Sequence, residues 1–294
     1  MQNVSAVRWL AKFAIGAAMV LIACGFATAR FGSGLQLPAT TTRDGTLITL
    51  SRYLRVPVPD VVLVGSSIAF RLKEEYFATP RLRNLALAGG SPVTGLEIVA
   101  GQPHLPAIIL VEANVLARPV DAALVERYSR GDSEPWFFRP IRAAVAAYEQ
   151  RLHAPLTHEQ VAVNLRRLAG QPPSDFDNRV YVDRALQQFE GEDPTDVAQS
   201  NAKRVAELIR TVEQRGARVF LFELPYSEPI EGSRYAATTR EIAHAAFPDS
   251  NRWLSIEVNR GELRWADAVH LDERSAVLVS QAMERALALV RGVK

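Results

Sequence analysis

Two short motifs, far apart in the chain, carry residue types that can perform nucleophilic chemistry together. The first is Gly65-Ser66-Ser67, which interrupts an apolar run and supplies two hydroxyl groups. The second is Asp267-x-x-His270, in which a carboxylate precedes an imidazole by three residues. A carboxylate can hold the Nδ1–H of a histidine and leave its Nε2 free to take a proton from a hydroxyl. The two motifs together therefore point to a serine nucleophile with a histidine base, although each alone is common.

The elements around the first motif are those that place a hydroxyl at the edge of a sheet. Residues 61–64 are apolar and end at Gly65, after which apolar residues up to Leu72 follow with the spacing of a helix face. This pattern indicates a buried strand that turns tightly into a helix. Open α/β sheets bind ligands at such a strand end, near the positive end of the helix dipole. A serine there is also a common helix cap, so the motif alone fits both roles.

Strands and helices alternate along the rest of the chain. Apolar runs predict further strands at 82–88, 106–113, 218–224 and around 253–258. Helices are expected between and after them, at 72–77, 92–100, 195–215, 239–246 and 275–290. This alternation predicts an α/β fold with a parallel sheet and helices on both faces. We expect a three-layer α/β/α sandwich with five strands in flavodoxin-like order.

The amino-terminal segment is apolar enough to cross a bilayer. Residues 9–29 carry one charge, Lys12, and span about 31 Å as a helix. Arg8 and Lys12 precede the uncharged part, so the positive-inside rule predicts a cytoplasmic amino terminus and an exported remainder. We expect a signal anchor; cleavage after Ala29 and a lipobox ending at Cys24 are the alternatives. All three place the rest of the chain outside the cytoplasm.

The chain divides into three expected parts, a signal anchor or signal peptide, a spacer and one domain, over residues 1–30, 31–59 and 60–294. Regular patterning lapses within the domain between 118 and 192, where aromatic residues mix with amphipathic helical stretches at 143–152 and 158–168. This segment is too long for a plain loop. It predicts an ordered helical insertion that packs over one side of the sheet.

Composition excludes several classes of protein and site. The chain has 34 Lys and Arg against 32 Asp and Glu, so it lacks the basic footprint of a nucleic-acid-binding domain. Its single cysteine allows no internal disulfide and no cysteine-based metal site. The five histidines lack the spacing of a metal-binding motif. We expect no cofactor, no metal ion and no nucleic-acid partner.

Four features occur in a fixed order along the chain. They are the ends of three strands, at Gly65-Ser66-Ser67, at Gly89 with Asn84 five residues earlier and at Asn114, and then Asp267-x-x-His270 before the last helix. In this order and placement the chain resembles the SGNH (GDSL-like) hydrolase superfamily, in the manner of its membrane-tethered bacterial envelope branch. The resemblance covers about residues 60–290 and leaves the insertion unmatched.

The resemblance implies a role for each matched residue. Ser67 aligns with the family's nucleophile, and His270 and Asp267 align with its base and the residue that orients the base. Gly89 would give a backbone N–H to the oxyanion hole, and Asn114 would give its side-chain NH₂. The backbone N–H of Ser67 could be a third donor. These are the parts that acyl transfer requires.

The chain departs from the family pattern in its first and third motifs. Ser66 stands where the family usually has Asp, and Glu112 stands where it usually has Gly. Glu112 would add bulk and charge near the expected oxyanion hole. Val115 replaces the Asp that usually braces the asparagine. These departures bear most on Asn114, which could also be a plain asparagine at the end of a strand.

The resemblance and the exported location together imply serine-dependent chemistry on acyl esters. We expect an esterase or O-acyltransferase in the periplasm, tethered to the inner membrane, that acts on acyl (foremost acetyl) esters of envelope or exported polysaccharide. A membrane-bound acyltransferase is a candidate partner. The alternative is a non-catalytic scaffold of the same fold that binds glycan or such an acyltransferase. Hydrogen-bond distance between Ser67 Oγ and His270 Nε2 would favour the enzyme.

Overall fold

A computed structural model describes residues 3–31, 41–130, 145, 146, 148, 152 and 156–292 of the chain. The chain forms two compact units, residues 1–56 with 136–156 and residues 57–135 with 157–294. The second unit begins at residue 57; the expected division into anchor, spacer and domain stays a prediction. Most of the helix expected at 143–152 lies outside the described residues.

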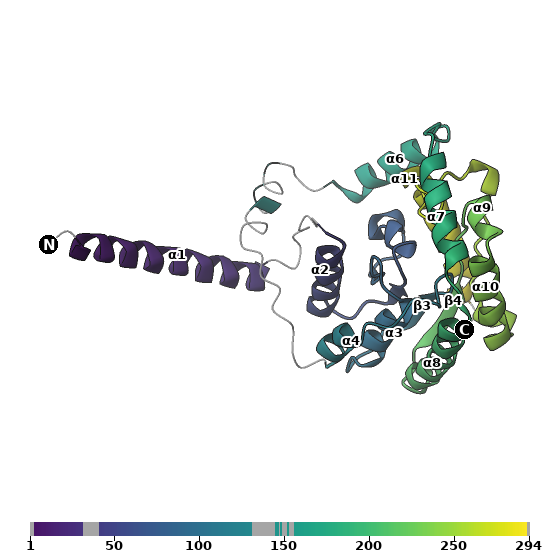
Figure 1. Ribbon diagram of the computed structural model, residues 1–294, viewed down its shortest axis with the longest axis horizontal. Coiled ribbons are helices and arrows are strands. Elements are labelled where there is room, and N and C mark those ends of the chain that lie inside the picture. Colours follow the sequence, from purple (N-terminus) through teal and green to yellow (C-terminus); the bar gives the residue numbers. More distant parts are fainter. Residues whose placement is uncertain are drawn as a thin grey trace. The chain divides into compact units, whose positions relative to one another are not determined.

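The first unit contains two described helices, α1 (Asn3–Phe31) and α2 (Thr42–Arg55) (Figure 1). Within α1, Ala6–Ala27 is long and apolar enough to cross a membrane, and its side chains are nearly all exposed. This segment matches a single membrane span or a signal sequence. Helix α2 begins after Thr41, whose side-chain oxygen accepts a hydrogen bond from the N–H of Asp44 at 3.1 Å.

Strands and helices alternate along the second unit (Figure 1). The strands are β1 (Val61–Val64), β2 (Leu82–Asn84), β3 (Ile108–Glu112) and β4 (Arg218–Phe222). The α-helices are α3 (Pro92–Ala100), α4 (Ala122–Tyr128), α6 (His158–Ala169), α7 (Arg179–Gly191), α8 (Thr195–Gln214), α9 (Glu228–Glu231), α10 (Arg234–Ala246) and α11 (Glu273–Gly292). The 3₁₀ helices are η2 (Ala69–Arg71), η3 (Glu74–Tyr76), η4 (Ser250–Arg252) and η5 (Arg260–Glu262).

The four strands form one parallel sheet in the order β2-β1-β3-β4. The α/β architecture with a parallel sheet is as expected, but the prediction of five strands is wrong. The segment expected as a fifth strand forms a single parallel bridge, between Leu221 and Trp253. Leu254 is the one buried residue in 253–258. That run therefore lacks the continuous apolar burial that a strand inside a parallel sheet requires.

Alternate side chains of each strand reach opposite faces of the sheet. Val61 and Leu63 belong to a buried cluster that includes Val277 and Met283 of α11. On the other face, α3 approaches β1 so closely that a Cβ at Gly95 would lie 3.3 Å from Cβ of Val64. The glycine thus allows close packing of helix on strand. Helices cover both faces, so the sheet is left uncovered at the carboxyl ends of its strands, which we call its open edge.

The segment after β1 is shorter and tighter than the sequence predicts. The expected helix through residues 72–77 is replaced by the two 3₁₀ helices η2 and η3. The side-chain amide of Asn84 donates to the carbonyls of Ala69 and Leu72, at 2.8 and 2.7 Å. These carbonyls would otherwise accept the next bonds of an α-helix. A helix-dipole argument for the Ser66-Ser67 turn therefore does not apply.

Candidate active site

The two sequence motifs that could perform chemistry meet at the open edge of the sheet. Ser67 Oγ lies 2.8 Å from His270 Nε2, across 203 positions of sequence. Nδ1 of His270 lies 2.7 Å from Asp267 Oδ2. If Nδ1 carries the proton, the carboxylate holds it there and Nε2 faces the hydroxyl as an acceptor. The three side chains form a continuous hydrogen-bonded line of carboxylate, imidazole and hydroxyl.

The loop that carries Asp267 and His270 is fixed at several points. Trp265 and Leu271 form an antiparallel bridge, and the N–H of Ala266 donates to the carbonyl of His270 at 2.8 Å. Asp267 Oδ1 also accepts from the backbone N–H of His270 at 2.8 Å. Ala268 adopts a φ of 72°, and its carbonyl accepts from the N–H of Ser227 at 3.1 Å. The orientation of the imidazole is thus determined by the loop as well as by its own hydrogen bonds.

The charge of Asp267 is favoured by the same hydrogen bonds. Partial burial raises the pKa of this carboxyl, but bonds from the side chain and backbone of His270 outweigh burial. The net result is a pKa below the ordinary value of an aspartate. Asp267 is therefore a carboxylate at neutral pH, as an acceptor for the imidazole N–H must be.

Glu112 holds the turn from beneath, which the sequence did not indicate. Its Oε2 accepts from the N–H of Ser66 at 2.6 Å, and its Oε1 accepts from the Ser66 hydroxyl at 3.0 Å. The N–H of Ala69 also donates to this carboxylate. A Cβ at Gly65 would lie 2.6 Å from Oε2, so only glycine lets the carboxylate approach. Glu112 is fully buried and does not line the cavity above Ser67, contrary to the expectation that it would crowd the oxyanion hole.

The buried carboxyl of Glu112 has an unusual affinity for protons. Burial raises its pKa to about 7, although the hydrogen bonds from Ser66 and Ala69 oppose this shift. The hydroxyl of Ser66 is engaged within the turn, because it donates to Glu112 and accepts from the N–H of Ile68 at 3.2 Å. The local capping role fits Ser66, and Ser67 is left to face His270.

Two backbone N–H groups are available beside Ser67. Neither the N–H of Ser67 nor that of Gly89 donates to an acceptor within the described part of the chain, and both residues line the cavity. Gly89 has a φ of 72°, a conformation that residues with a Cβ rarely adopt. Asn84 braces this region as well, because its Oδ1 accepts from the N–H of Ala86 at 2.8 Å. The arrangement can stabilise an oxyanion that forms next to Ser67.

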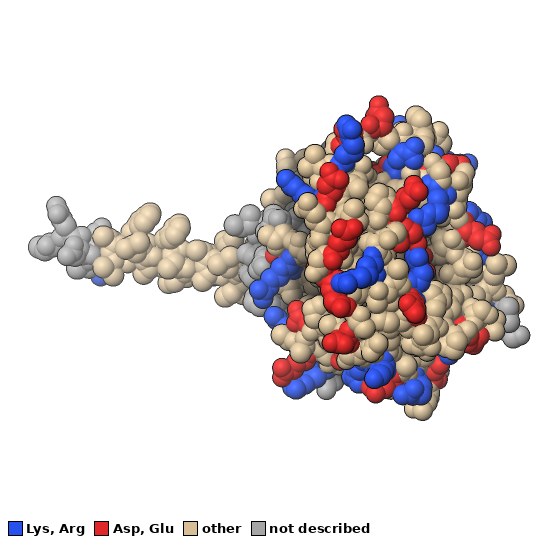
Figure 2. Space-filling view, turned by 45° about the vertical axis from the view of Figure 1, so that its right-hand side comes forward, with Lys and Arg blue, Asp and Glu red and all other residues tan. Residues whose placement is uncertain are grey.

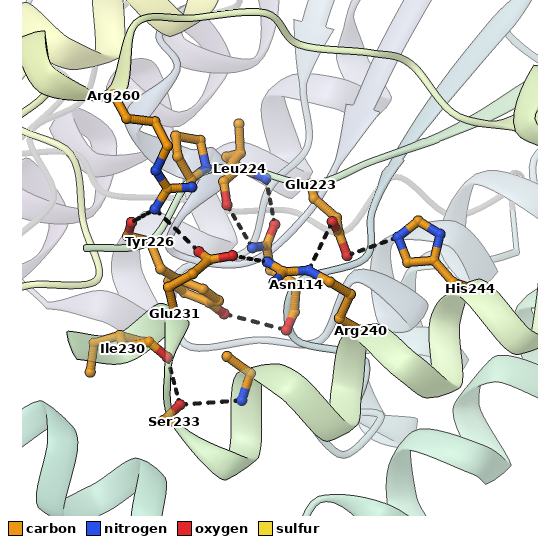
Figure 3. Close-up of polar contacts among 12 residues, drawn as sticks. Asn114, Glu223, Leu224, Tyr226, Ile230, Glu231, Ser233, Arg240, His244 and Arg260 are labelled. Atoms are coloured by element: carbon orange, nitrogen blue, oxygen red, sulfur yellow. Dashed lines mark hydrogen bonds and ion pairs between the residues drawn. The ribbon is translucent and has the colours of Figure 1, made fainter. Parts of the chain in front are cut away.

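Asn114 does not lie where the resemblance implied, and Figure 3 shows its side-chain contacts with Leu224. Its NH₂ donates to the carbonyl of Leu224 at 2.8 Å, and its Oδ1 accepts from the N–H of the same residue at 2.7 Å. The backbone carbonyl of Asn114 accepts from the Tyr226 hydroxyl at 3.3 Å. Asn114 is buried and does not line the cavity. Its side chain joins the ends of β3 and β4, so Asn114 is not part of the expected oxyanion hole.

Next to this junction, two glutamates form a network of contacts with two arginines and a histidine (Figure 3). Glu223 lies 3.2 Å from Arg240 and 3.6 Å from Nε2 of His244. Glu231 pairs with Arg240 and, at 3.4 Å, with Arg260. These residues do not line the cavity above Ser67. The network fixes the loops that follow β4 and has no direct contact with the Ser67–His270 pair.

A cavity of about 260 Å³ opens above Ser67 and His270. One of its walls is a face of α7, which carries Tyr181, Arg184 and Gln188 into the lining. Pockets for drug-sized ligands span about 300–1,000 Å³, so this one suits a small acyl group and part of its acceptor. The sequence predicted an ordered insertion here but no functional residue. The spacing of three and four residues along α7 was the signal that these side chains share one face.

Protein-family models and curated proteins were both compared with the chain, and neither comparison finds a match. Among the described residues, no group of three or more His, Cys, Asp or Glu side chains could hold a metal ion. The chemistry that this site can perform therefore has to be inferred from the geometry of its own side chains.

Proposed function

We propose that the chain is a serine hydrolase or acyltransferase that acts on acyl esters. The observation that carries this proposal is the line of hydrogen bonds from Asp267 through His270 to Ser67, at 2.7 and 2.8 Å. A hydroxyl is a weak nucleophile at neutral pH and needs an adjacent base to become reactive. The loop contacts at Asp267 and the carboxylate beneath Ser66 hold the two halves of this line in place.

Each step of the proposed reaction uses a group with a suitable position. Ser67 Oγ attacks the ester carbonyl while His270 Nε2 takes its proton, and Asp267 stabilises the resulting imidazolium. The N–H groups of Ser67 and Gly89 stabilise the tetrahedral oxyanion. The intermediate collapses to an acyl-serine as His270 returns the proton to the departing alcohol. Water or a sugar hydroxyl then attacks the acyl-serine while His270 takes its proton. The bond between the acyl carbon and Ser67 Oγ breaks, and His270 returns the proton to Oγ, which regenerates Ser67.

The architecture supports membership of the SGNH hydrolase type. The order β2-β1-β3-β4 equals the first four positions of the flavodoxin-like order, and helices lie on both faces of the sheet. We therefore assign a three-layer α/β/α sandwich of this type to the second unit. Ligands of such sheets bind outside the carboxyl ends of the strands, which is where Ser67 lies.

The amino-terminal helix supports an envelope location. Ala6–Ala27 acts as a single-pass anchor in the bacterial inner membrane, with the second unit in the periplasm. Acyl esters available there include those of envelope or exported polysaccharide, and acetyl suits the small cavity. A membrane-bound acyltransferase that supplies or receives the acyl group is the proposed partner.

A non-catalytic scaffold of the same fold accounts less well for the geometry. Binding alone does not require Ser67 Oγ at 2.8 Å from His270 Nε2, nor a carboxylate aligned behind the imidazole. The departures that would mark a degenerate site, Ser66 and Glu112, instead contact each other and support the turn. The enzyme is therefore the better-supported function.

Hydrolysis of p-nitrophenyl acetate by the full-length chain in detergent tests the proposal. Ser67→Ala and His270→Ala should each lower kcat by at least about 10³-fold, since the nucleophile or its base is lost. Ser255→Ala and His104→Ala, at exposed positions outside the cavity, are matched controls and should retain the wild-type rate. If Ser67→Ala and His270→Ala turn over the ester as fast as these controls, the proposed mechanism is wrong.

A further inference from the structure

The charges in the cavity above Ser67 do not balance. Among the described residues that line it are Arg118 and Arg184, and Asp267 is the one acidic residue among them. Asp267 is already committed to His270, which it contacts through its side chain at 2.7 Å. The cavity therefore presents two positive charges and no carboxylate that is free to neutralise them.

Arg118 is the more informative of the two arginines because it is half-buried. No carboxylate lies within ion-pair distance of it in the described part of the chain. Arg118 interacts electrostatically with the hydroxyls of Tyr226 and Tyr235, on which the buried Glu112 also acts. Burial raises the pKa of Tyr235 to about 12 and that of Tyr226 well above its ordinary value, so both hydroxyls stay neutral. A partly desolvated cation is costly unless an anion approaches it.

Several arginines elsewhere in this unit have a carboxylate partner. Arg204 lies 2.8 Å from Glu97, and Arg240 lies 3.2 Å from Glu223. Figure 2 shows acidic and basic side chains interspersed over the face that it presents. Arg118 differs from Arg240, which is half-buried like it, because no described carboxylate lies within ion-pair distance of Arg118.

Helix α7 places Arg184 next to a surface suited to a sugar ring. Tyr181 precedes Arg184 by one turn and lines the cavity with it. The ring of Tyr181 stacks on that of Phe176, with ring centroids 6.3 Å apart, and both side chains are exposed. An exposed aromatic ring offers an apolar face that a sugar ring can contact. An apolar ring face beside a guanidinium fits a sugar that carries an acidic group.

We propose that the site selects an acyl ester whose sugar carries an anionic group, a carboxylate or a phosphate, bound by Arg118 and Arg184. This inference rests on the proposed function, since it names the substrate of the Ser67 site. A guanidinium binds either anion with two parallel hydrogen bonds. The anion neutralises the cavity, Tyr181 contacts the ring, and the ester carbonyl reaches Ser67.

Three acetyl esters test this inference. They are methyl glycosides with the acetyl group at one shared position and a hydroxymethyl, a carboxylate or a phosphomethyl group at C5. We expect the full-length chain in detergent to release acetate from an anionic ester with a kcat/KM at least about tenfold higher than from the neutral one. Tenfold corresponds to about 1.4 kcal/mol. The preference should shrink between about 20 and about 500 mM NaCl, because salt screens the interaction.

Variants separate the arginines from the rest of the site. Arg118→Gln with Arg184→Gln should bring the ratio of kcat/KM for anionic and neutral esters close to one. Arg210→Gln, which removes an exposed arginine of α8 outside the cavity, should keep the wild-type ratio. A preference for the carboxylate alone or for the phosphate alone supports the inference and identifies the anion. Equal kcat/KM for all three esters, with release still dependent on Ser67, overturns it.

A binding measurement keeps this inference distinct from the proposed function. Saturation-transfer NMR of the full-length chain with methyl glucuronoside, methyl glucoside 6-phosphate and methyl glucoside reports binding without turnover. Stronger binding of the glucuronoside or of methyl glucoside 6-phosphate, lost in the arginine double variant, supports the anion site even if Ser67→Ala leaves ester turnover unchanged. Equal binding of all three glycosides at low salt overturns the anion site whatever the esterase assay shows.

Discussion

Replacing Glu112 by glutamine tests how the turn that carries Ser67 is supported. The carboxyl of Glu112 is fully buried and contacts both the N–H and the hydroxyl of Ser66. Its pKa rises to about 7 from a value of 4.5 in the unfolded chain. A carboxyl group with a higher pKa in the folded state stabilises the fold fully below the unfolded pKa, and this contribution is lost as the pH rises through the folded pKa. Glutamine does not titrate, so Glu112→Gln lacks this pH dependence.

The expected magnitude follows from the two pKa values. Each pKa unit corresponds to about 1.4 kcal/mol, so the shift from 4.5 to about 7 amounts to about 3 kcal/mol in total. Roughly a quarter of this has been lost by pH 5, and nearly all of it by pH 8. The free energy of unfolding of the wild type, minus that of Glu112→Gln, should therefore fall by about 2–3 kcal/mol between these two pH values.

Urea unfolding of the full-length chain in detergent, followed by tryptophan fluorescence, measures this difference. Other titrating groups contribute equally to wild type and variant, so they cancel in the subtraction. Glu190→Gln, which removes an exposed carboxylate of α7, is the matched control, and its difference should change by less than about 0.5 kcal/mol. A wild-type minus Glu112→Gln difference that stays constant from pH 5 to pH 8 would refute a buried carboxyl beneath Ser66.

Three further predictions concern single residues of the site. Asp267→Asn should lower kcat about 10³- to 10⁴-fold, because the amide no longer accepts the Nδ1–H of His270. Its unfolding free energy should change little. A wild-type kcat in an ester assay would contradict this prediction. Asn84→Ala removes three hydrogen bonds and should lower the unfolding free energy by about 2–4 kcal/mol, as measured by urea titration. A loss below about 1 kcal/mol would show that these hydrogen bonds contribute little. Gly89→Ala forces a Cβ to a φ of 72°, so it should lose about 1–2 kcal/mol of stability together with Ser67-dependent turnover. A fully stable and active variant would show that this turn accepts a Cβ without displacing the N–H of residue 89.

The Ser67–His270 pair could be expected from sequence because it depends on where elements end. In a parallel sheet the carboxyl ends of strands share one edge, so a hydroxyl after β1 is brought to that edge by the pattern of apolar residues alone. Helix α3 begins where Ser91 accepts from the N–H of Val93 and Pro92 occupies the first turn, a signal that is local in sequence. Such features can be predicted without knowledge of tertiary contacts.

Other features depend on contacts between distant residues, which local patterns do not contain. The carbonyls of Ala69 and Leu72 are taken by Asn84, so the apolar spacing that predicts a helix there gives 3₁₀ turns instead. The side chain of Asn114 hydrogen-bonds to the backbone of Leu224, 110 positions away, and is therefore not available to the oxyanion hole. From the sequence, Glu112 was expected to crowd the oxyanion hole. Its contact with Ser66 across Gly65 joins residues 46 positions apart, which local patterns do not predict.

Labelling with a fluorophosphonate tests the central claim most directly. An activated serine attacks the phosphorus, forms a P–O bond and expels fluoride, so the adduct identifies the nucleophile by mass. Peptide mapping of the labelled full-length chain should place the adduct on Ser67, with labelling abolished in Ser67→Ala and strongly slowed in His270→Ala. An adduct on Ser66, or no adduct on either serine, would contradict the account of Ser67 as a nucleophile activated by His270 and Asp267.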